Sequence, residues 1–515
     1  MVSNDRFREL VAHCKEYGFV FPSSEIYDGL GAVYDYGHNG VELKNNIREY
    51  WWRSMVQMHE NIVGIDAAIF MHPTVWKASG HVDAFQDPLI DNRDSKKRYR
   101  ADTLVEDYLA RLEEKAGKEI ERARKRFGDR FNEHMFRQTN ERLQQLEQQM
   151  NDVRRRLQEA LETNDLEGLR RLIDDCGIAD PESGTRNWTE VRQFNLMFAT
   201  QLGAVSGESD TIYLRPETAQ GIYVNFLNVQ KTSRQKIPFG IAQVGKAFRN
   251  EIVARQFIFR MREFEQMEMQ FFVRPGTETE WYETWKQRRM DWHRRLGFDP
   301  DAYRFKDHLK LAHYAKAACD IEFRFPFGFK ELEGIHSRGD YDLGNHQKFS
   351  GKKLQYFDPD LGSSYVPYVV ETSIGLDRMV LAVLSASYAE EQVPKADAEE
   401  SSSRVVLRLP SVLAPVKVAV LPLVARDGLP EAARKIFDRL KMFCRCYYEE
   451  KDTIGRRYRR QDAIGTPFAL TIDQQTLSDE TVTLRYRDTL HQDRISVRGV
   501  EQIIQEKLDW RQWLA

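Results

Sequence analysis

The chain has 515 residues, of which 41% are hydrophobic and 30% are charged, and its formal net charge is −3. This composition is typical of a globular protein of roughly three domains. No run of about 18 apolar residues is present and the N-terminus lacks a signal-peptide pattern, so we expect a cytoplasmic protein without a membrane partner. The small net charge excludes nucleic-acid binding through the overall field and leaves it to local basic patches.

A long segment from about Ala101 to Ile173 is highly charged and has the apolar spacing of helices. One apolar set with steps of three and four residues is Leu143, Leu146, Met150, Val153, Leu157 and Ala160. A second set that can face it is Leu104, Tyr108, Leu112, Ile120, Ala123 and Phe127. This pattern predicts an antiparallel coiled-coil hairpin with its turn near FGDRF, inserted into another domain and outside the catalytic site. Its basic run RARKRFGDR suits contact with nucleic-acid phosphates.

The stretch IFRMREFEQMEMQFF, residues 258–272, alternates apolar and polar side chains as a strand with one polar face does. The apolar set is Phe259, Met261, Met267 and Met269, and the polar set is Arg260, Arg262, Glu268 and Gln270. The preceding QVGKAFRNE predicts a partner strand, with IVARQFI as the connecting loop. Arginine on such a face favours phosphate recognition, although a solvent-facing ladder of salt bridges would give the same pattern.

The C-terminal part begins after a polar, serine-rich stretch, Tyr388 to Arg404, which predicts a linker. Beyond it, VKVAVLPLV predicts a buried strand, Pro430 to Phe443 a helix, and PFALTID and TVTLRYR two further strands. We therefore expect a compact α/β domain here.

Five cysteines, Cys14, Cys176, Cys319, Cys444 and Cys446, are scattered and odd in number. This distribution favours reduced thiols over a disulfide framework. Cys444 and Cys446 form a C-x-C pair, but no second pair completes a zinc site.

Three motifs occur in order along the chain. They are F-R-x-E at Arg249 and Glu251, R-x-x-x-F at Arg260 and Phe264, and SIGLDRMVLAVL with Gly375 and Arg378 at the start of an apolar helix. Together they resemble motifs 2 and 3 of class II aminoacyl-tRNA synthetases. The segments GLGAVYDYG, ELKNNIREYWWRSMV, ASGHVDAF, YLRPETAQGIYVNF, KELEGI and YVVETSIGLDR are similar to glycyl-tRNA synthetases of the homodimeric type. The resemblance covers the chain except about Asp87 to Glu190.

The resemblance implies an α/β (α+β) fold of class II type. An antiparallel-sheet catalytic domain would carry the helical coiled-coil insertion, and a C-terminal α/β anticodon-binding domain would follow it. We expect residues 1–86 to form the first part of the catalytic domain with its dimer motif, 87–190 the insertion, 191–400 the second catalytic part, and 405–515 the anticodon-binding domain. The implied assembly is a homodimer.

By the same resemblance, the chain activates glycine with ATP to glycyl-adenylate and transfers glycine to the 3′ end of tRNA(Gly). The expected catalytic residues are Arg249, Glu251 and Arg378. Arg249 would hold the α-phosphate, Arg260 the far phosphates, and Phe264 and Arg378 the two faces of adenine. Such positioning of positive charge stabilises the phosphate in the transition state.

The metal expectations also follow from the resemblance. Glu331 of KELEG is the expected Mg²⁺ or ATP-organising carboxylate, and Glu322 is a weaker candidate; an ordinary carboxylate at a strand end is the alternative for Glu331. Many family members carry paired cysteines near residues 87–102 and 176–188, where this chain has Cys176 alone. We therefore expect no zinc.

Glycine offers an ammonium, a carboxylate and no side chain. Glu217, Glu268 and Glu371 match the carboxylates that surround the ammonium in the family, and Ser373 matches the residue that crowds the α-carbon. A small rigid pocket rejects larger amino acids by steric clash.

Two alternatives remain open at this point. A non-catalytic binding protein on the same fold would have lost the ATP residues, but this chain retains all five of them: Arg249, Glu251, Arg260, Phe264 and Arg378. A ligase with a non-tRNA acceptor would have no use for an anticodon-binding domain.

Overall fold

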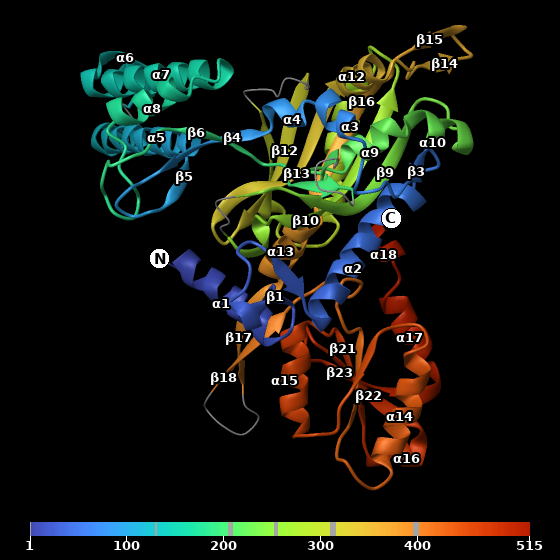
Figure 1. Ribbon diagram of the computed structural model, residues 1–515. Helices are drawn as coiled ribbons and strands as arrows, with labels where there is room; N and C mark the ends of the chain where they lie inside the picture. Colours follow the sequence, from blue (N-terminus) through green and yellow to red (C-terminus); the bar gives the residue numbers. More distant parts are fainter. Residues whose placement is uncertain are drawn as a thin grey trace. The chain divides into compact units, whose positions relative to one another are not determined.

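The computed structural model describes residues 2–128, 131–203, 210–251, 256–308, 316–394 and 401–514 (Figure 1). The chain divides into two compact units. The first consists of Met1–Ser79, Phe198–Arg249 and Ala254–Ala515, and the second of Gly80–Met197 and Asn250–Val253. Within these described ranges, no helix is both long enough and apolar enough to cross a membrane.

The first unit is built around a seven-stranded sheet of order β11-β12-β13-β16-β10-β9-β3. Its strands are β3 (Ile62–Gly64), β9 (Phe239–Phe248), β10 (Glu263–Val273), β11 (Tyr303–Asp307), β12 (Ala317–Phe325), β13 (Gly328–Gly339) and β16 (Tyr368–Gly375). Neighbouring strands are antiparallel except β3 and β9, which are parallel. The predicted antiparallel-sheet catalytic core is therefore confirmed.

Helices and short strands surround this sheet. The helices are α1 (Val2–Glu16), α2 (His38–Trp52), α3 (Pro73–Ala78), α9 (Ala219–Val224), α10 (Phe226–Ser233), α11 (Glu278–Arg294), α12 (Tyr341–Ser350) and α13 (Leu376–Ser387). The short strands are β1 (Val20–Pro22), β2 (Tyr34–Tyr36), β7 (Ala199–Leu202), β8 (Asp210–Tyr213), β14 (Tyr356–Asp358) and β15 (Ser363–Tyr365).

The alternation predicted for the central strand holds from Gln266 to Gln270 of β10, whereas Glu263 and Glu265 place carboxylates on the face that Met267 and Met269 share. Met267 and Met269 lie in the main apolar core, whereas Glu268 and Gln270 belong to the opposite face. The strand does not extend back to Phe259, however, because Phe257–Phe259 forms a 3₁₀ turn, η4. Gln256 and Phe257 have positive φ angles of 71° and 58°, which break the extended backbone. Arg260 therefore follows a turn and does not share the strand with Glu268.

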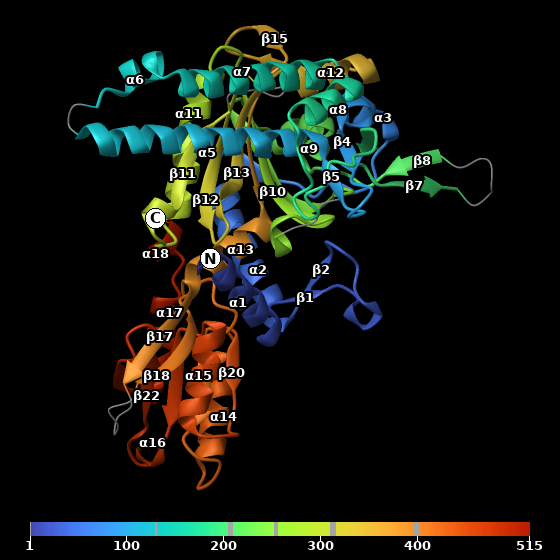
Figure 2. The same ribbon diagram turned by 90° about the vertical axis from the view of Figure 1, so that its left-hand side faces the viewer.

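The second unit contains a three-stranded sheet and a helical hairpin. Its elements are α4 (His81–Ala84), β4 (Gln86–Asp91), β5 (Arg98–Arg100), α5 (Ala101–Phe127), α6 (Glu133–Thr139), α7 (Glu141–Glu162), α8 (Leu166–Asp175) and β6 (Arg192–Asn195). Figure 2 shows α5 and α7 side by side, and ion pairs join Glu119 to Arg142 and Glu113 to Arg154, as antiparallel helices require.

The predicted apolar seam of this hairpin is largely correct. Five of its residues on α7 are buried, and Leu146 packs beside them. On α5, however, Phe127 is 51% exposed, because it is the last residue of the helix. Asp129 and Arg130 of the expected turn and basic run lie outside the described residues.

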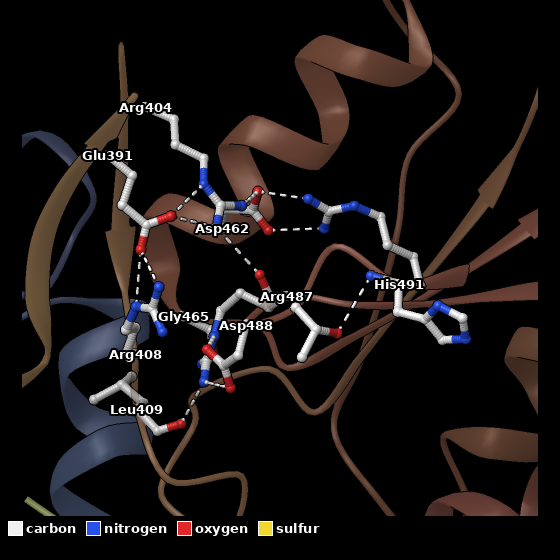
Figure 3. A network of polar contacts seen from close by, with 11 residues as sticks. Glu391, Arg404, Arg408, Leu409, Asp462, Gly465, Arg487, Asp488 and His491 are labelled. Carbon is white, nitrogen blue, oxygen red and sulfur yellow. Dashed lines mark hydrogen bonds and ion pairs between the residues drawn. The ribbon is translucent and has the colours of Figure 1, made fainter. Parts of the chain in front are cut away.

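The linker predicted at Tyr388–Arg404 is wrong for its described part. There, β17 (Tyr388–Pro394) and β18 (Ser401–Leu407) form an antiparallel pair. Arg404 is 6% exposed and donates to Glu391 on β17, 2.7 Å, and to Asp462, 2.7 Å (Figure 3). Arg485 donates to the same carboxylate of Asp462, 2.9 Å. Polar composition suggested a solvated linker, but these charged groups compensate one another in a buried network.

The C-terminal domain is a five-stranded sheet of order β20-β19-β21-β22-β23 with helices. Its elements are β19 (Val418–Pro422), α14 (Leu429–Leu440), β20 (Cys446–Tyr448), α15 (Ile454–Ile464), β21 (Phe468–Ile472), α16 (Gln474–Asp479), β22 (Thr481–Tyr486), β23 (Gln492–Ser496), α17 (Val500–Lys507) and α18 (Arg511–Leu514). The predicted strands VKVAVLPLV, PFALTID and TVTLRYR correspond to β19, β21 and β22, and the predicted helix to α14. The expected α/β domain is confirmed.

Candidate active site

A cluster of carboxylates lies on the polar face of the central sheet, where β10, β16 and β13 are neighbours (Figure 1). The β10–β16 register places Glu268 opposite Ser373 and Gln270 opposite Glu371. Glu268 is 2% exposed. It accepts one hydrogen bond from Ser373 Oγ, 2.8 Å, and another from the Thr218 hydroxyl. The register alone therefore brings two of the predicted glycine-binding acids and Ser373 together.

Glu371 has a different set of partners. Its carboxylate accepts from Arg338 Nη1 at 3.1 Å and from Gln270 Nε2 at 2.8 Å, and it contacts His336 Nδ1 at 2.9 Å. The Arg338 guanidinium is buried and also donates to both oxygens of Asp342, at 2.8 and 3.0 Å. Arg338 is thus the cation that compensates this side of the cluster.

The pKa values of the two buried glutamates, Glu268 and Glu371, are shifted in opposite directions. Burial, the charge of Glu371 and the charge of Glu217 together raise the pKa of Glu268. Burial alone would also raise the pKa of Glu371, but the Arg338 charge and the His336 hydrogen bond outweigh it and lower that pKa. One carboxylate is therefore compensated within the protein, whereas the other gains most from an added positive charge.

Glu217 joins this cluster from the other side. Gln220 Nε2 donates to Glu217 Oε1, 2.8 Å, and to Asp342 Oδ1, 3.0 Å. The chain Glu217–Gln220–Asp342–Arg338 therefore links the third predicted acid to the cation that holds Glu371. Glu217 and Glu371 therefore belong to one hydrogen-bond network, and the charges of both act on the neighbouring Glu268.

Beside the carboxylate cluster, the backbone of Gly245 packs closely against the side chain of Arg215. Gly245 on β9 lies opposite Gln266 of β10. A Cβ atom there would lie 2.3 Å from Nη2 of Arg215, which is itself fixed by donating to Lys246 O at 2.6 Å and Ala67 O at 2.7 Å. A side chain at this position would displace Arg215, so glycine is required by the close approach.

The predicted phosphate residue Arg249 lies at the end of β9. Its Nε donates to Pro216 O, 3.1 Å, and its guanidinium lies 5.3 Å from the centre of the Phe264 ring. Pro216 precedes Glu217, so this contact joins the predicted ATP-binding and glycine-binding residues. Glu251 belongs to the second compact unit, whereas Arg249 belongs to the first, so the structure does not group Glu251 with the other predicted ATP-binding residues.

The predicted adenine residue Arg378 lies in the first turn of α13. Its guanidinium is 4.5 Å from the centre of the Phe259 ring, Nε donates to Phe259 O at 3.2 Å, and Nη1 pairs with Glu331 Oε1 at 3.1 Å. Arg260 follows Phe259 directly with an extended backbone. Phe264 thus contacts the guanidinium of Arg249, whereas Arg378 contacts the ring of Phe259.

The two predicted metal carboxylates lie opposite each other on β12 and β13. The Glu331 side chain is 51% exposed, and the Arg378 charge is the main cause of its lowered pKa. Glu322 is buried and pairs with Arg304 at 2.6 Å and Lys306 at 3.1 Å; these contacts outweigh burial and lower its pKa. Among the described residues, no group of three or more His, Cys, Asp or Glu side chains is placed to hold a metal ion. Glu331 therefore remains the more accessible of the two.

Sequence reasoning missed Arg338, Asp342, Gln220 and Thr218, and it placed Gln270 on the polar face without giving it a role in the site. The sequence held a partial signal for the first two, because a charged pair four residues apart follows the segment KELEGI. No sequence pattern shows that Arg338 reaches Glu371, since their contact depends on the pairing of β13 with β16.

Three family descriptions match successive parts of the chain. "Glycyl-tRNA synthetase insertion domain 1" covers residues 87–196, "tRNA synthetase class II core domain (G, H, P, S and T)" residues 202–387, and "Anticodon binding domain" residues 417–507. A glycine–tRNA ligase of Chlorobaculum tepidum is 48% identical over 97% of this chain and 99% of its own length. The chain belongs to the glycine–tRNA ligase family. This membership confirms the resemblance found in the sequence, and a class II core implies the use of ATP.

Other relatives agree with this assignment. The glycine–tRNA ligase of Caldanaerobacter subterraneus subsp. tengcongensis is 46% identical over 97% of this chain and 98% of its own length. Among solved structures, Giardia lamblia prolyl-tRNA synthetase in complex with prolyl-adenylate has a TM-score of 0.58 at 14% identity, covering 98% of this chain and 79% of that chain. At this identity the likeness supports the class II fold alone.

Proposed function

We propose that the chain is a glycine–tRNA ligase, which activates glycine with ATP to glycyl-adenylate and passes glycine to the 3′ end of tRNA(Gly). The observation that carries this proposal is the buried carboxylate pair Glu268 and Glu371. Within the described part of the chain, Glu371 accepts a hydrogen bond from an arginine, whereas Glu268 accepts from two hydroxyl groups and from the Gln266 amide. Such a site favours a small ligand that brings its own positive charge.

Glycine binding follows from this arrangement. The ammonium group lies among Glu217, Glu268 and Glu371, with Glu268 providing the charge that Arg338 does not compensate. The Ser373 hydroxyl is fixed by its bond to Glu268 and limits the space at the α-carbon. Larger amino acids are then excluded by clash, which discriminates more strongly than a loose pocket would.

Adenylate formation joins the glycine carboxylate to the α-phosphate of ATP, and pyrophosphate leaves. We assign Arg249 to the α-phosphate, Arg260 to the far phosphates, and Phe264 and Arg378 to adenine, with Glu251 as a further catalytic residue. The contact of Arg249 with Pro216 supports this assignment, because it holds the guanidinium beside Glu217. Arg249 would stabilise the charge that develops on the phosphate. No protein nucleophile is required.

Glu331 is the residue we assign to Mg²⁺, which offsets phosphate charge when bound. Its exposed carboxylate supports this choice over Glu322, whose oxygens already pair with two cations. We expect no zinc. Arg378 lowers the pKa of the Glu331 carboxylate and so keeps it ionised. Arg378 would have to share this carboxylate with the metal.

The remaining proposals concern organisation. We assign residues 1–86 to the first part of the catalytic domain with the dimer motif and 191–400 to its second part with the ATP-binding and glycine-binding residues. Residues 87–190 form the insertion, and 405–515 the anticodon-binding domain. The enzyme would act as a cytoplasmic homodimer. The similarity of residues 417–507 to anticodon-binding domains supports tRNA as the acceptor.

The experiment that tests the function is amino-acid-dependent ATP–pyrophosphate exchange with all twenty amino acids. Glycine alone should support strong exchange, and Glu371→Gln should raise the glycine requirement at least about tenfold while the ATP requirement changes less. Stronger exchange with alanine, serine or proline would refute the specificity. No exchange with any amino acid would favour the non-catalytic alternative, and exchange without charging of total tRNA would favour another acceptor.

A further inference from the structure

The C-x-C pair of the C-terminal domain takes no part in the proposed reaction. Cys444 lies in the turn after α14, and Cys446 is the first residue of β20. Their Sγ atoms are 3.6 Å apart, and both side chains are partly exposed. The two thiols are free but already in contact. A disulfide requires the sulfurs to approach to about 2.05 Å, which is a small movement from this position.

The surroundings of the pair make its two thiols unequal. Cys444 lines a cavity of about 460 Å³ together with Lys417 and Arg445. A hydrogen bond from Cys446 and then the Lys417 charge lower the pKa of the Cys444 thiol. The same hydrogen bond, followed by burial, raises the pKa of Cys446. Cys444 therefore reacts first as a thiolate, and Cys446 follows.

We propose that Cys444 and Cys446 form a thiol–disulfide exchange site whose substrates are low-molecular-weight disulfides. The Cys444 thiolate attacks one sulfur of the disulfide RSSR, the S–S bond breaks, and one RS⁻ leaves and takes up a proton. Cys446 then loses its proton to solvent and attacks Sγ of Cys444, and the second RS⁻ leaves. The protein pair is oxidised by two electrons, and RSSR is reduced to two RSH.

The residue between the two cysteines connects the pair to the catalytic domain. Arg445 O accepts from Lys417 N at 2.8 Å, and Arg445 Nη1 pairs with Glu42 Oε1 of α2 at 2.9 Å. Closing a disulfide across Arg445 changes the turn that carries this ion pair. Oxidation should therefore alter how the C-terminal domain contacts α2.

The test uses the full-length protein, glutathione disulfide and intact mass spectrometry. We expect the protein to lose two hydrogen atoms without retaining glutathione. Trypsin cuts after Arg445, so non-reducing digestion should give peptide 442–445 linked to peptide 446–451, and dithiothreitol should separate them. Cys446→Ser should stop at one glutathione on Cys444, whereas Cys444→Ser should react slowly.

Cys176 serves as the internal control, because it is also partly exposed but burial raises its pKa. Modification of Cys176 as fast as Cys444 would overturn the proposal, since general exposure would then explain the reactivity. Failure of the Cys446→Ser protein to retain glutathione would also overturn it. So would a pair that stays reduced and instead retains a soft metal ion such as Cu(I).

The effect on charging rests on the proposed function and is measured separately. Oxidised protein should charge tRNA at least several-fold more slowly than reduced protein, while ATP–pyrophosphate exchange changes little. If the reduced protein shows no exchange, the proposed function fails and the mass result is unaffected. If reduced and oxidised proteins charge equally, the link from Arg445 to α2 is refuted.

Discussion

Glycine binding should strengthen as the pH rises, because the site contains a carboxyl group that must lose its proton before it can hold an ammonium. Glu268 is 2% exposed, and burial followed by the charges of Glu371 and Glu217 raises its pKa. Below that pKa, each unit by which the pH falls adds about 1.4 kcal/mol to the cost of ionising Glu268, which corresponds to about a tenfold loss of glycine affinity. Between about pH 6 and 8 the glycine KM should therefore fall by up to about tenfold per unit.

The assay is ATP–pyrophosphate exchange at saturating ATP, with the glycine KM measured at each pH. Glu268→Gln is the matched variant, because it keeps the shape and remains neutral. It should have a weak glycine affinity that changes little with pH. Calorimetry in buffers of different ionisation enthalpy should show proton release when glycine binds the unmodified protein. A pH-independent KM together with no proton release would refute this reasoning.

Three further predictions concern other parts of the molecule. Arg249→Ala should abolish exchange without lowering the melting temperature, and exchange within tenfold of the parent would remove Arg249 from the mechanism. Arg338→Gln should cost about 3–5 kcal/mol in unfolding free energy by leaving buried carboxylates uncompensated, whereas the exposed control Arg324→Gln should cost less than about 1 kcal/mol; equal losses in denaturant titrations would contradict this. Replacing Ile120–Glu141, the hairpin tip, with a short Gly/Ser linker should spare exchange and weaken tRNA charging most at low salt, and loss of exchange in the folded variant would place the tip in the catalytic core.

The sequence was sufficient where a local pattern determines the structure. The two-residue alternation around Met267 and Met269 predicts the faces of β10, and the steps of three and four residues predict the buried face of α7. It was insufficient where polar composition is compatible with two environments. Arg404 was predicted to lie in a solvated linker, but Asp462 from α15 and Glu391 from β17 together make its burial favourable.

The position of Arg338 shows why the complete site could not be predicted from motifs. Successive side chains of a regular strand point to opposite faces, and the register of β13 against β16 shifts between Ser337 and Gly339. Arg338 lies at this irregularity, where its guanidinium reaches both Glu371 and Asp342. A register shift depends on tertiary pairing, so no periodicity in the sequence reveals it.

The same network explains how a cluster of buried acids can be stable and still be able to bind a cation. Arg338 compensates Glu371 and Asp342, which fixes one side of the cluster before any ligand binds. Glu268 is left with two hydroxyl donors, one amide donor and a raised pKa, so its ionisation costs folding stability. That stability is retained at low pH and lost as the pH rises through the raised pKa. A bound ammonium removes this cost by supplying the missing charge. In the proposed site the substrate would therefore complete the electrostatics, and an added arginine that donated directly to Glu268 would stabilise the empty protein while removing its reason to bind glycine.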